Sequence, residues 1–170
     1  MQLNFGQRYL WLALALICGT LVVSSILLTY FWHLHPCYLC VFQRFLFLLI
    51  MMLAILILLF KTKFTSWLYG GLLILCSLIG IGIASYQVWL QSLPGSEFTC
   101  SSSEPNLVEI FVIWMNSWVP VLFEATGNCA STELVILYLS LAGWALVAFS
   151  TCLIIAVWGV YLRYQQLRRL

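Results

Sequence analysis

Charged residues are scarce in this chain. They make up 7% of its 170 residues, whereas a soluble globular domain carries about 25%. Hydrophobic residues make up 64%, which excludes an ordinary water-soluble domain and indicates an integral membrane protein. The small net charge of +2 gives no reason to expect a nucleic-acid partner.

The chain also lacks the alternating pattern of a membrane β-barrel, because its apolar runs are continuous. A helix needs about 20 apolar residues to cross a bilayer, and four runs are long enough: residues 9–31, 41–60, 67–90 and 134–161. The first run is too long for a signal peptide, so we expect it to remain as an anchor. The sequence therefore predicts an all-α integral membrane protein with a four-transmembrane-helix bundle, as one domain over residues 1–170.

The few charges divide by position along the chain. Six cations lie before the first run, between the second and third, or after the fourth: Arg8, Lys61, Lys63, Arg163, Arg168 and Arg169. All five acids are glutamates within residues 91–133. Because cytoplasmic loops are enriched in Lys and Arg, both termini are predicted to be cytoplasmic. Residues 32–40 and 91–133 are then the two exported, periplasmic segments.

The seven cysteines divide in the same way. Three lie within apolar runs, where cysteine packs as a small hydrophobic residue: Cys18, Cys76 and Cys152. The other four lie in the exported segments, which are on the oxidising side if the membrane is a bacterial inner membrane: Cys37, Cys40, Cys100 and Cys129.

Cys37 and Cys40 form a C-x-x-C pair at the predicted start of the second helix, directly after Pro36. Residues three apart on a helix are neighbours, so the pair can form a disulfide. The partial positive charge of a helix N-terminus favours the thiolate. Such a pair closes almost no loop, which makes redox or metal chemistry more plausible than a structural bridge. Cys100 and Cys129, by contrast, could simply close a loop of about 30 residues, worth about 3–4 kcal/mol.

Arg44 follows Cys40 by four residues and therefore shares its helix face. A cation near the bilayer centre costs about 2.5–3.5 kcal/mol, and less towards the edge, so such a residue is a functional hypothesis by default. Arg44 could snorkel to lipid phosphates. Alternatively, it could stabilise negative charge on a Cys40 thiolate and on a nearby electron acceptor.

A dithiol that becomes a disulfide must pass two electrons to an acceptor. The sequence has no dinucleotide fingerprint, haem motif or iron–sulfur spacing. By elimination, we expect the acceptor to be a quinone dissolved in the membrane.

The stretch PCYLCVFQR (residues 36–44), with four spans and a long second exported segment, resembles the bacterial DsbB family. Two further stretches agree, QVWLQSLP (residues 87–94) and WVPVLFEATGNCA (residues 118–130), so the resemblance covers residues 9–162. DsbB proteins are inner-membrane oxidases that recharge DsbA, the periplasmic disulfide donor. That DsbA, DsbB and quinone keep the periplasm oxidising is known for the family and does not come from these residues.

The resemblance implies a role for each exported cysteine. Cys100 forms a mixed disulfide with a periplasmic DsbA-type thioredoxin-fold partner, and Cys129 is its disulfide mate. Cys37 exchanges with the second exported segment through Cys129. Cys40 is then left as a thiolate beside the quinone.

The resemblance also implies a quinone site, for ubiquinone or menaquinone, formed by Cys40, Arg44 and Gln87. Some family members have a histidine where this chain has Gln87. A glutamine can donate a hydrogen bond to a quinone carbonyl but cannot change its charge.

Residues 105–123 are unusually apolar for an exported segment. On a helix, the polar residues fall on one face: Asn106, Glu109, Asn116 and Ser117. At about 12–14 residues the helix is too short to span a bilayer, so we expect a short interfacial helix that ends near Pro120. It would keep Cys129 close to the bilayer while Cys100 reaches the partner.

Three other functions stay open on the residues alone. A metal-handling membrane protein could bind copper or zinc through the first exported segment: His33, His35, Cys37 and Cys40. A thiol oxidase with a dedicated substrate, or a distant relative of the vitamin K epoxide reductase type, would share the four-helix plan. A structural protein with one loop disulfide would leave Arg44 without a role.

Overall fold

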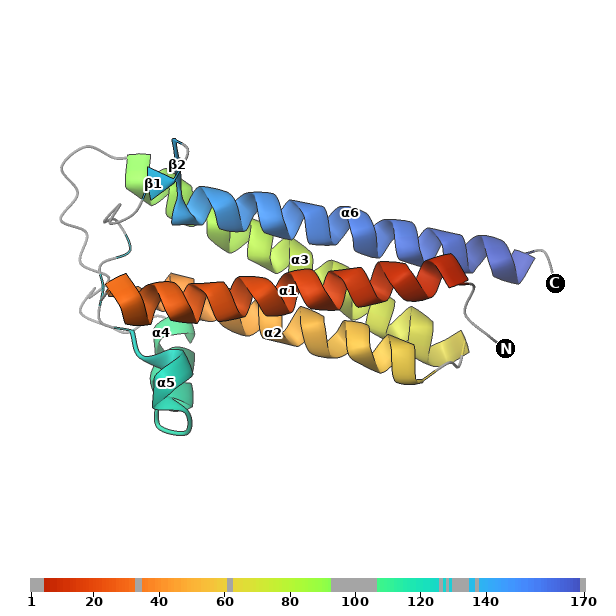
Figure 1. Cartoon of the computed structure of the whole chain (residues 1–170), viewed down its shortest axis with the longest axis horizontal. Coiled ribbons are helices and arrows are strands. Elements are labelled where there is room, and N and C mark those ends of the chain that lie inside the picture. Colours follow the sequence, from red (N-terminus) through yellow and green to blue (C-terminus); the bar gives the residue numbers. More distant parts are fainter. Residues whose placement is uncertain are drawn as a thin grey trace.

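The computed structural model describes residues 5–32, 35–60, 63–92, 107–125, 127, 129, 135–136 and 138–168. Four long helices form the body of the described chain (Figure 1): α1 (Phe5–Trp32), α2 (Tyr38–Leu59), α3 (Lys63–Ser92) and α6 (Leu141–Arg168). Each contains a segment that is long and apolar enough to cross a membrane. The prediction of an all-α membrane protein with a four-helix bundle is therefore confirmed.

The spans are helical because a bilayer leaves no alternative for a continuous apolar run. Their mean hydropathy lies between 2.0 and 2.6, and backbone N–H and C=O groups in hydrocarbon must be paired within the segment. The start of α2 is set locally. Cys37 has extended backbone (φ −82°, ψ 165°) and precedes the first helical residue. The N–H of Val41 then donates to the carbonyl of Cys37 at 3.1 Å, which closes the first turn.

The four helices pack in a ring, in which α2 contacts α1 and α3, and α6 contacts α3 and α1. At the centre, the ring of Phe47 stacks on that of Phe149, with centroids 4.0 Å apart. Gly80 of α3 permits this arrangement, because a Cβ there would lie 2.4 Å from the Phe149 ring. The three cysteines predicted to pack as hydrophobic residues are all buried: Cys18, Cys76 and Cys152.

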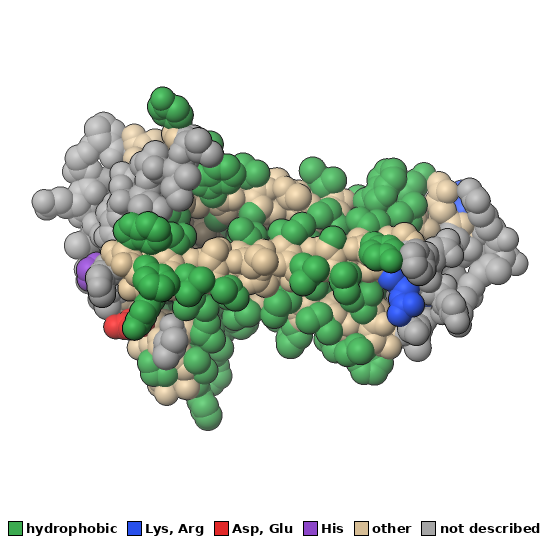
Figure 2. All heavy atoms as spheres, viewed as in Figure 1, with side chains coloured by type: hydrophobic (Ala, Val, Ile, Leu, Met, Phe, Trp, Pro, Cys, Tyr) green, Lys and Arg blue, Asp and Glu red, His purple; other side chains and the backbone are tan. Residues whose placement is uncertain are grey.

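The two ends of the bundle differ in charge. Both chain termini lie at one end (Figure 1), and the described cations Arg8, Arg163 and Arg168 belong to the same ends of α1 and α6. Glu109 and Glu124 lie at the opposite end, and Figure 2 shows the positive and negative side chains separated in this way. This separation matches the charge pattern of the sequence, and the orientation of the bundle in a membrane stays a prediction.

Two short helices, α4 (Leu107–Asn116) and α5 (Pro120–Phe123), lie beside the end opposite the termini. They pack on α2 through a cluster with Val41, Val112 and Phe123 at its centre. The expected short apolar helix is therefore present, and its place in a membrane interface stays a prediction. It is shorter than predicted, because Pro120 is the first residue of α5 and does not mark the end of α4. The end of α4 is Asn116.

The two sides of α4 differ in exposure. Glu109 and Val112 are buried towards the bundle, whereas Ile110, Ile113 and Trp114 are about half exposed. An apolar outer side suits a helix that lies in the membrane interface.

The last span begins at Leu141, later than the predicted residue 134. A small hairpin comes first, in which β1 (Val135–Ile136) pairs with β2 (Leu139–Ser140) in antiparallel fashion. Tyr138 in its turn has a φ of 65°, a conformation that an α-helix cannot include. The Ser140 hydroxyl accepts a hydrogen bond from the N–H of Gly143 at 3.3 Å, as an N-cap residue does.

Candidate thiol redox site

Three of the four cysteines predicted to lie in exported segments meet at the end of the bundle opposite the termini. The thiol of Cys37 donates to the sulfur of Cys40 across 3.2 Å, and it also forms a hydrogen bond with Cys129. Cys37, Cys129 and Leu90 form one buried cluster against which Cys40 packs. The exposed fractions are 3% for Cys37 and 1% for Cys129. Cys100 lies outside the described residues, so its place relative to this cluster stays a prediction.

Cys37 and Cys40 are in contact but are not joined by a disulfide bond. Their sulfurs are 3.2 Å apart, whereas a disulfide bond measures about 2.05 Å. Cys37 immediately precedes α2 and Cys40 lies in its first turn. The pair therefore sits at the helix start that the spacing predicted.

Cys129 lies beside this pair because the backbone two residues before Cys129 contacts the backbone of Pro36, the residue directly before Cys37. The N–H of Gly127 donates to the carbonyl oxygen of Pro36 at 3.1 Å. A Cβ on Gly127 would lie 1.8 Å from the carbonyl oxygen of His35, so only a residue without a side chain allows this approach. The sequence reasoning missed Gly127. The sequence feature that could have identified Gly127 is its position two residues before a loop cysteine, because glycine permits a close approach of two backbone segments.

One buried amide of α3 contacts the sulfurs, and a second amide, from α2, orients it. Nε2 of Gln87 donates to the sulfur of Cys40 at 3.0 Å and contacts that of Cys37 at 3.6 Å. Its Oε1 accepts a hydrogen bond from Nε2 of Gln43 at 3.0 Å. Both glutamines are buried, and this pairing fixes the Gln87 N–H groups towards sulfur.

The structure thus places Gln87 against the thiols, and its expected contact with a quinone stays a prediction. Gln43 was not predicted as a site residue. Gln43 could have been identified as a polar side chain inside an apolar span, because polar residues in such spans usually have a functional role.

Arg44 turns into the bundle and not outward to lipid. It is 8% exposed, and its Nε donates to the Ser25 hydroxyl at 2.7 Å. Its Nη2 donates to the Ser25 carbonyl at 3.3 Å and to the Thr29 hydroxyl. Thr29 in turn donates to the Ser25 carbonyl at 3.0 Å. Ser25 and Thr29 were not predicted either, although their spacing of four places both on one face of α1.

The surroundings favour the thiol at Cys37 and negative charge at Cys40. The pKa of Cys37 is raised above its ordinary value, first by its hydrogen bond with Cys129, then by that with Cys40 and by burial. At Cys37 these contacts oppose the partial positive charge of the helix start, which by itself favours the thiolate. Cys40 instead accepts N–H from Gln87 and has Arg44 one helical turn away, and both stabilise an anionic sulfur.

The donors beside Cys40 fit an acceptor that carries carbonyl groups. A guanidinium has five N–H donors, and the bonds from Arg44 to α1 use three of them. Among the described residues, these bonds leave further Arg44 donors for an incoming carbonyl, one helical turn from a partly buried Cys40. The residues present fit a quinone.

A metal site finds less support. Among the residues that the structure describes, no three His, Cys, Asp or Glu side chains are grouped so that they could hold a metal ion. His33, one of the four residues of the metal-handling alternative, lies outside the described part of the chain.

Comparison with known proteins decides between the families considered. Residues 7–159 match the family model described as disulfide bond formation protein DsbB. The chain belongs to the DsbB family. A protein of Dechloromonas aromatica (strain RCB) named Disulfide bond formation protein B is 36% identical over 150 residues, which cover 86% of this chain and 88% of that protein.

Other relatives agree. Proteins with the same name are 30% identical over 157 residues in Azoarcus sp. (strain BH72), covering 92% of this chain and 93% of that protein, and 33% identical over 151 residues in Nitrosomonas europaea, covering 88% and 91%. Membership of the DsbB family confirms the predicted resemblance. It makes the chain a disulfide-forming oxidoreductase of the membrane. The family therefore favours this function over a metal-handling or a purely structural one.

Proposed function

We propose that this DsbB-family chain reoxidises a periplasmic dithiol protein of the DsbA type and passes the two electrons to a membrane quinone, either ubiquinone or menaquinone. It does so in the bacterial inner membrane, with both termini cytoplasmic. The observation that carries this proposal is the meeting of Cys37, Cys40 and Cys129 at the end of the bundle opposite the termini. That cluster brings a cysteine of the second exported segment to the start of a helix that is long and apolar enough to cross a membrane.

The first exchange takes place in the second exported segment. A thiolate of the partner attacks Cys100 in a Cys100–Cys129 disulfide, and Cys129 leaves as a thiolate. The second thiolate of the partner then attacks the partner sulfur of the mixed disulfide. The partner leaves oxidised, Cys100 leaves reduced, and two protons of the partner thiols are released to water.

The second exchange moves the two electrons to the first pair. The thiolate of Cys129 attacks Cys37 in a Cys37–Cys40 disulfide, and Cys40 leaves. The contact of Cys129 with Cys37 supports this choice of sulfur. The N–H of Gln87 on Cys40 supports the choice of leaving group, because a better stabilised thiolate leaves faster.

The loop disulfide is then restored. The thiolate of Cys100 attacks Cys129 in the Cys37–Cys129 bond, and Cys37 leaves and takes up a proton. The contacts that raise the pKa of Cys37 hold this sulfur as a neutral thiol once it has left, so it is a poor nucleophile for attack on the restored disulfide.

A bound quinone supplies an acceptor for two electrons and two protons. Arg44, which Ser25 and Thr29 hold, would donate hydrogen bonds to its carbonyl groups. Cys40 holds negative charge one turn away, and Cys37 carries the proton of its thiol. DsbA has a potential of about −120 mV, so its acceptor must lie above that value, which glutathione pools near about −200 mV do not.

The proposal is tested by quinone reduction with the purified protein in detergent. A reduced DsbA-type protein is added, and the absorbance of ubiquinone or menaquinone is followed for the wild type, Cys40→Ser and Cys76→Ala. We expect turnover in the wild type and in Cys76→Ala, whose cysteine is buried elsewhere, and its loss in Cys40→Ser. A folded wild type that reduces neither quinone would contradict the proposal.

A further inference from the structure

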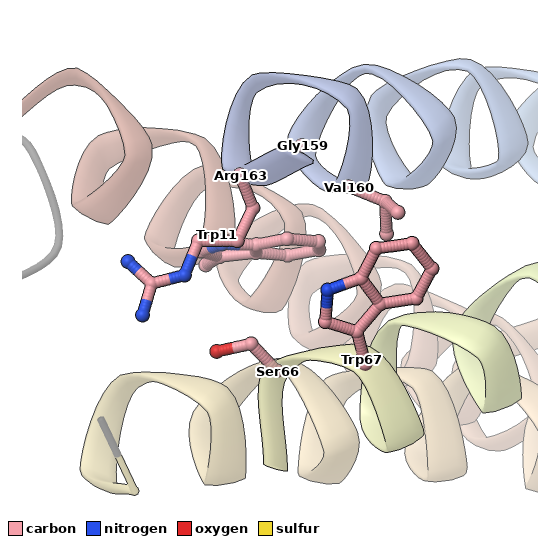
Figure 3. A pocket seen from close by; sticks show the side chains of 6 residues that line it. All are labelled: Trp11, Ser66, Trp67, Gly159, Val160 and Arg163. Carbon is pink, nitrogen blue, oxygen red and sulfur yellow. The ribbon is translucent and has the colours of Figure 1, made fainter. Parts of the chain in front are cut away.

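Buried polar side chains lie in the spans at both ends of the bundle. At the end that carries the termini, a small cavity is lined by Trp11, Ser66, Trp67, Gly159, Val160 and Arg163 (Figure 3). Its polar residues Ser66 and Arg163 have partners within the chain. At the other end, Gln43 of α2 and Gln87 of α3 are 5% and 2% exposed. Because polar residues are expensive inside a span, this second pair is expected to have a function.

The amide of Gln87 has one acceptor and a donor group, and the structure directs them to opposite sides. Its Oε1 accepts a hydrogen bond from Nε2 of Gln43 at 3.0 Å. Its Nε2 donates to the sulfur of Cys40 at 3.0 Å and lies 3.6 Å from that of Cys37. The orientation of this one amide therefore decides which of its atoms faces the sulfurs.

Half a turn of the Gln87 amide about its last side-chain bond would exchange the two sides. Its oxygen would then face the sulfur of Cys40, and its N–H groups would face those of Gln43. An oxygen beside a thiolate sets acceptor against acceptor, so it destabilises the anion that an N–H stabilises. Gln43 opposes this turn, because its N–H needs an acceptor on Gln87 and a buried donor without a partner is costly.

Gln43 acts on the sulfurs only through its neighbour. It follows Cys40 by three residues on α2, but its hydrogen bond within the described chain goes to Gln87. We propose that Gln43 is a positioning residue, which holds the N–H of Gln87 on Cys40 and thereby raises the reduction potential of the Cys37–Cys40 couple.

The direction of this effect follows from the reaction of the couple. Two electrons and one proton convert the Cys37–Cys40 disulfide to a Cys37 thiol and a Cys40 thiolate. With glutathione as the reductant, two glutathione thiols form a disulfide and release two protons, one to Cys37 and one to water. The N–H of Gln87 mainly stabilises the reduced form, because an anionic sulfur is a much stronger acceptor than a disulfide sulfur. A side chain that holds this donor in place therefore favours reduction.

The inference rests on the proposed function, in which the Cys40 thiolate leaves when Cys129 attacks Cys37 and then lies beside the quinone. A higher potential of the first pair favours the transfer of electrons into it from Cys129. The pair of amides therefore assists the step that joins the two exported segments.

The potential is measured on the full chain in detergent, equilibrated with glutathione redox buffers. After an acid quench, the protein is denatured and alkylated, and mass spectrometry counts the thiols of Cys37 and Cys40. Gln43→Met keeps the length of the side chain without a donor. We expect it to lower the equilibrium constant for reduction about three- to tenfold, which corresponds to about 15–30 mV.

Two variants serve as controls for this measurement. Gln43→His keeps a ring N–H at a similar reach, so it should not lower the equilibrium constant. Ser66→Ala removes a buried hydroxyl from a span at the other end of the bundle and should leave the constant unchanged. If Gln43→Met fails to fold, Gln43→Asn replaces it with the same expectation, because its amide is one carbon shorter and cannot reach Gln87.

A double variant tests whether Gln43 acts through Gln87. Gln43→Met/Gln87→Leu should have the same equilibrium constant as Gln87→Leu alone, because without the Gln87 amide there is nothing to position. Losses that multiply in the double variant would overturn the proposal. An unchanged constant in Gln43→Met, or an equal fall in Gln43→His, would do so too.

This measurement contains neither the partner protein nor a quinone. An unchanged constant in Gln43→Met would therefore overturn the role of Gln43 even in a protein that reduces quinone. A lowered constant in a protein that reduces neither quinone would support the role of Gln43 and contradict the proposed function alone.

Discussion

The approach of the two exported segments at Gly127 can be tested by adding one methyl group. In Gly127→Ala the new Cβ would lie 1.8 Å from the carbonyl oxygen of His35, whereas ordinary contact begins at 3.4 Å. The second segment must therefore move away by about 1.6 Å, because the obstacle is backbone. Cys129 follows two residues later and moves away from Cys37 with it.

This displacement separates two steps of the proposed reaction. Misplacing reacting groups by about 1 Å can cost about 100-fold in rate. We therefore predict that Gly127→Ala lowers steady-state quinone reduction about 100-fold. The exchange between the partner and Cys100 should persist, because it does not need Cys37. Rapid mixing should then show one equivalent of partner oxidised quickly, followed by slow turnover.

Gly82→Ala is the matched control, since a Cβ on Gly82 meets nothing within 4 Å. It should turn over like the wild type. If Gly127→Ala did so as well, the idea that this contact holds Cys129 against Cys37 would be refuted.

Three further predictions concern the charges and surfaces around the thiols. Gln87→Leu should lower the reduction potential of the Cys37–Cys40 couple by about 30–65 mV, because the reduced form loses a hydrogen bond to Cys40. A hydrogen bond to a charged group is worth about 1.5–3 kcal/mol, and 30 mV corresponds to about 1.4 kcal/mol. Equilibration with redox buffers measures the potential. In the reduced protein, alkylation of Cys37 followed by mass spectrometry should stay slow at pH 8.5, where an ordinary thiol is half ionised, because its raised pKa preserves the thiol; Cys129→Ala should speed it. Trp114→Asp should lower quinone reduction several-fold, because it places a charge on the lipid-facing side of α4.

Two of these have a control in the same chain. Gln91→Leu removes a neighbouring amide of α3 whose buried oxygen has no partner among the described residues, and should leave the potential unchanged. Trp114→Phe keeps an apolar side chain and should keep activity. An unchanged potential in Gln87→Leu would contradict the role of the Gln87–Cys40 hydrogen bond. Alkylation of Cys37 at the rate of an ordinary thiol would contradict its raised pKa. Full turnover of Trp114→Asp would contradict the interfacial role of α4.

Much of the architecture could be predicted because the bilayer restricts what an apolar run can form. The four spans follow from length and composition alone. The place of Cys37 and Cys40 at a helix start follows from Pro36 and from their spacing. The start of α6 was predicted too early, because the residues before it are also apolar and only the left-handed Tyr138 shows that they form a hairpin.

The contacts between elements could not be predicted in the same way. Spacing identifies neighbours only within one helix, whereas the bond from Gln43 to Gln87 depends on how α2 and α3 are rotated against each other. The same holds for Arg44, which was expected to face either lipid or a thiolate and in fact bonds to Ser25 of α1. The meeting of Cys129 with Cys37 was implied by the family resemblance alone.

That meeting is the central claim, because it joins the partner side of the protein to the quinone side. It is tested by the double variant Cys40→Ser/Cys100→Ser, in which Cys37 and Cys129 are the two cysteines left in the exported segments. After mild oxidation in detergent, disulfides are mapped by mass spectrometry without reduction. A disulfide between Cys37 and Cys129 within one chain is the predicted result, and two thiols that both remain open to alkylation would contradict it.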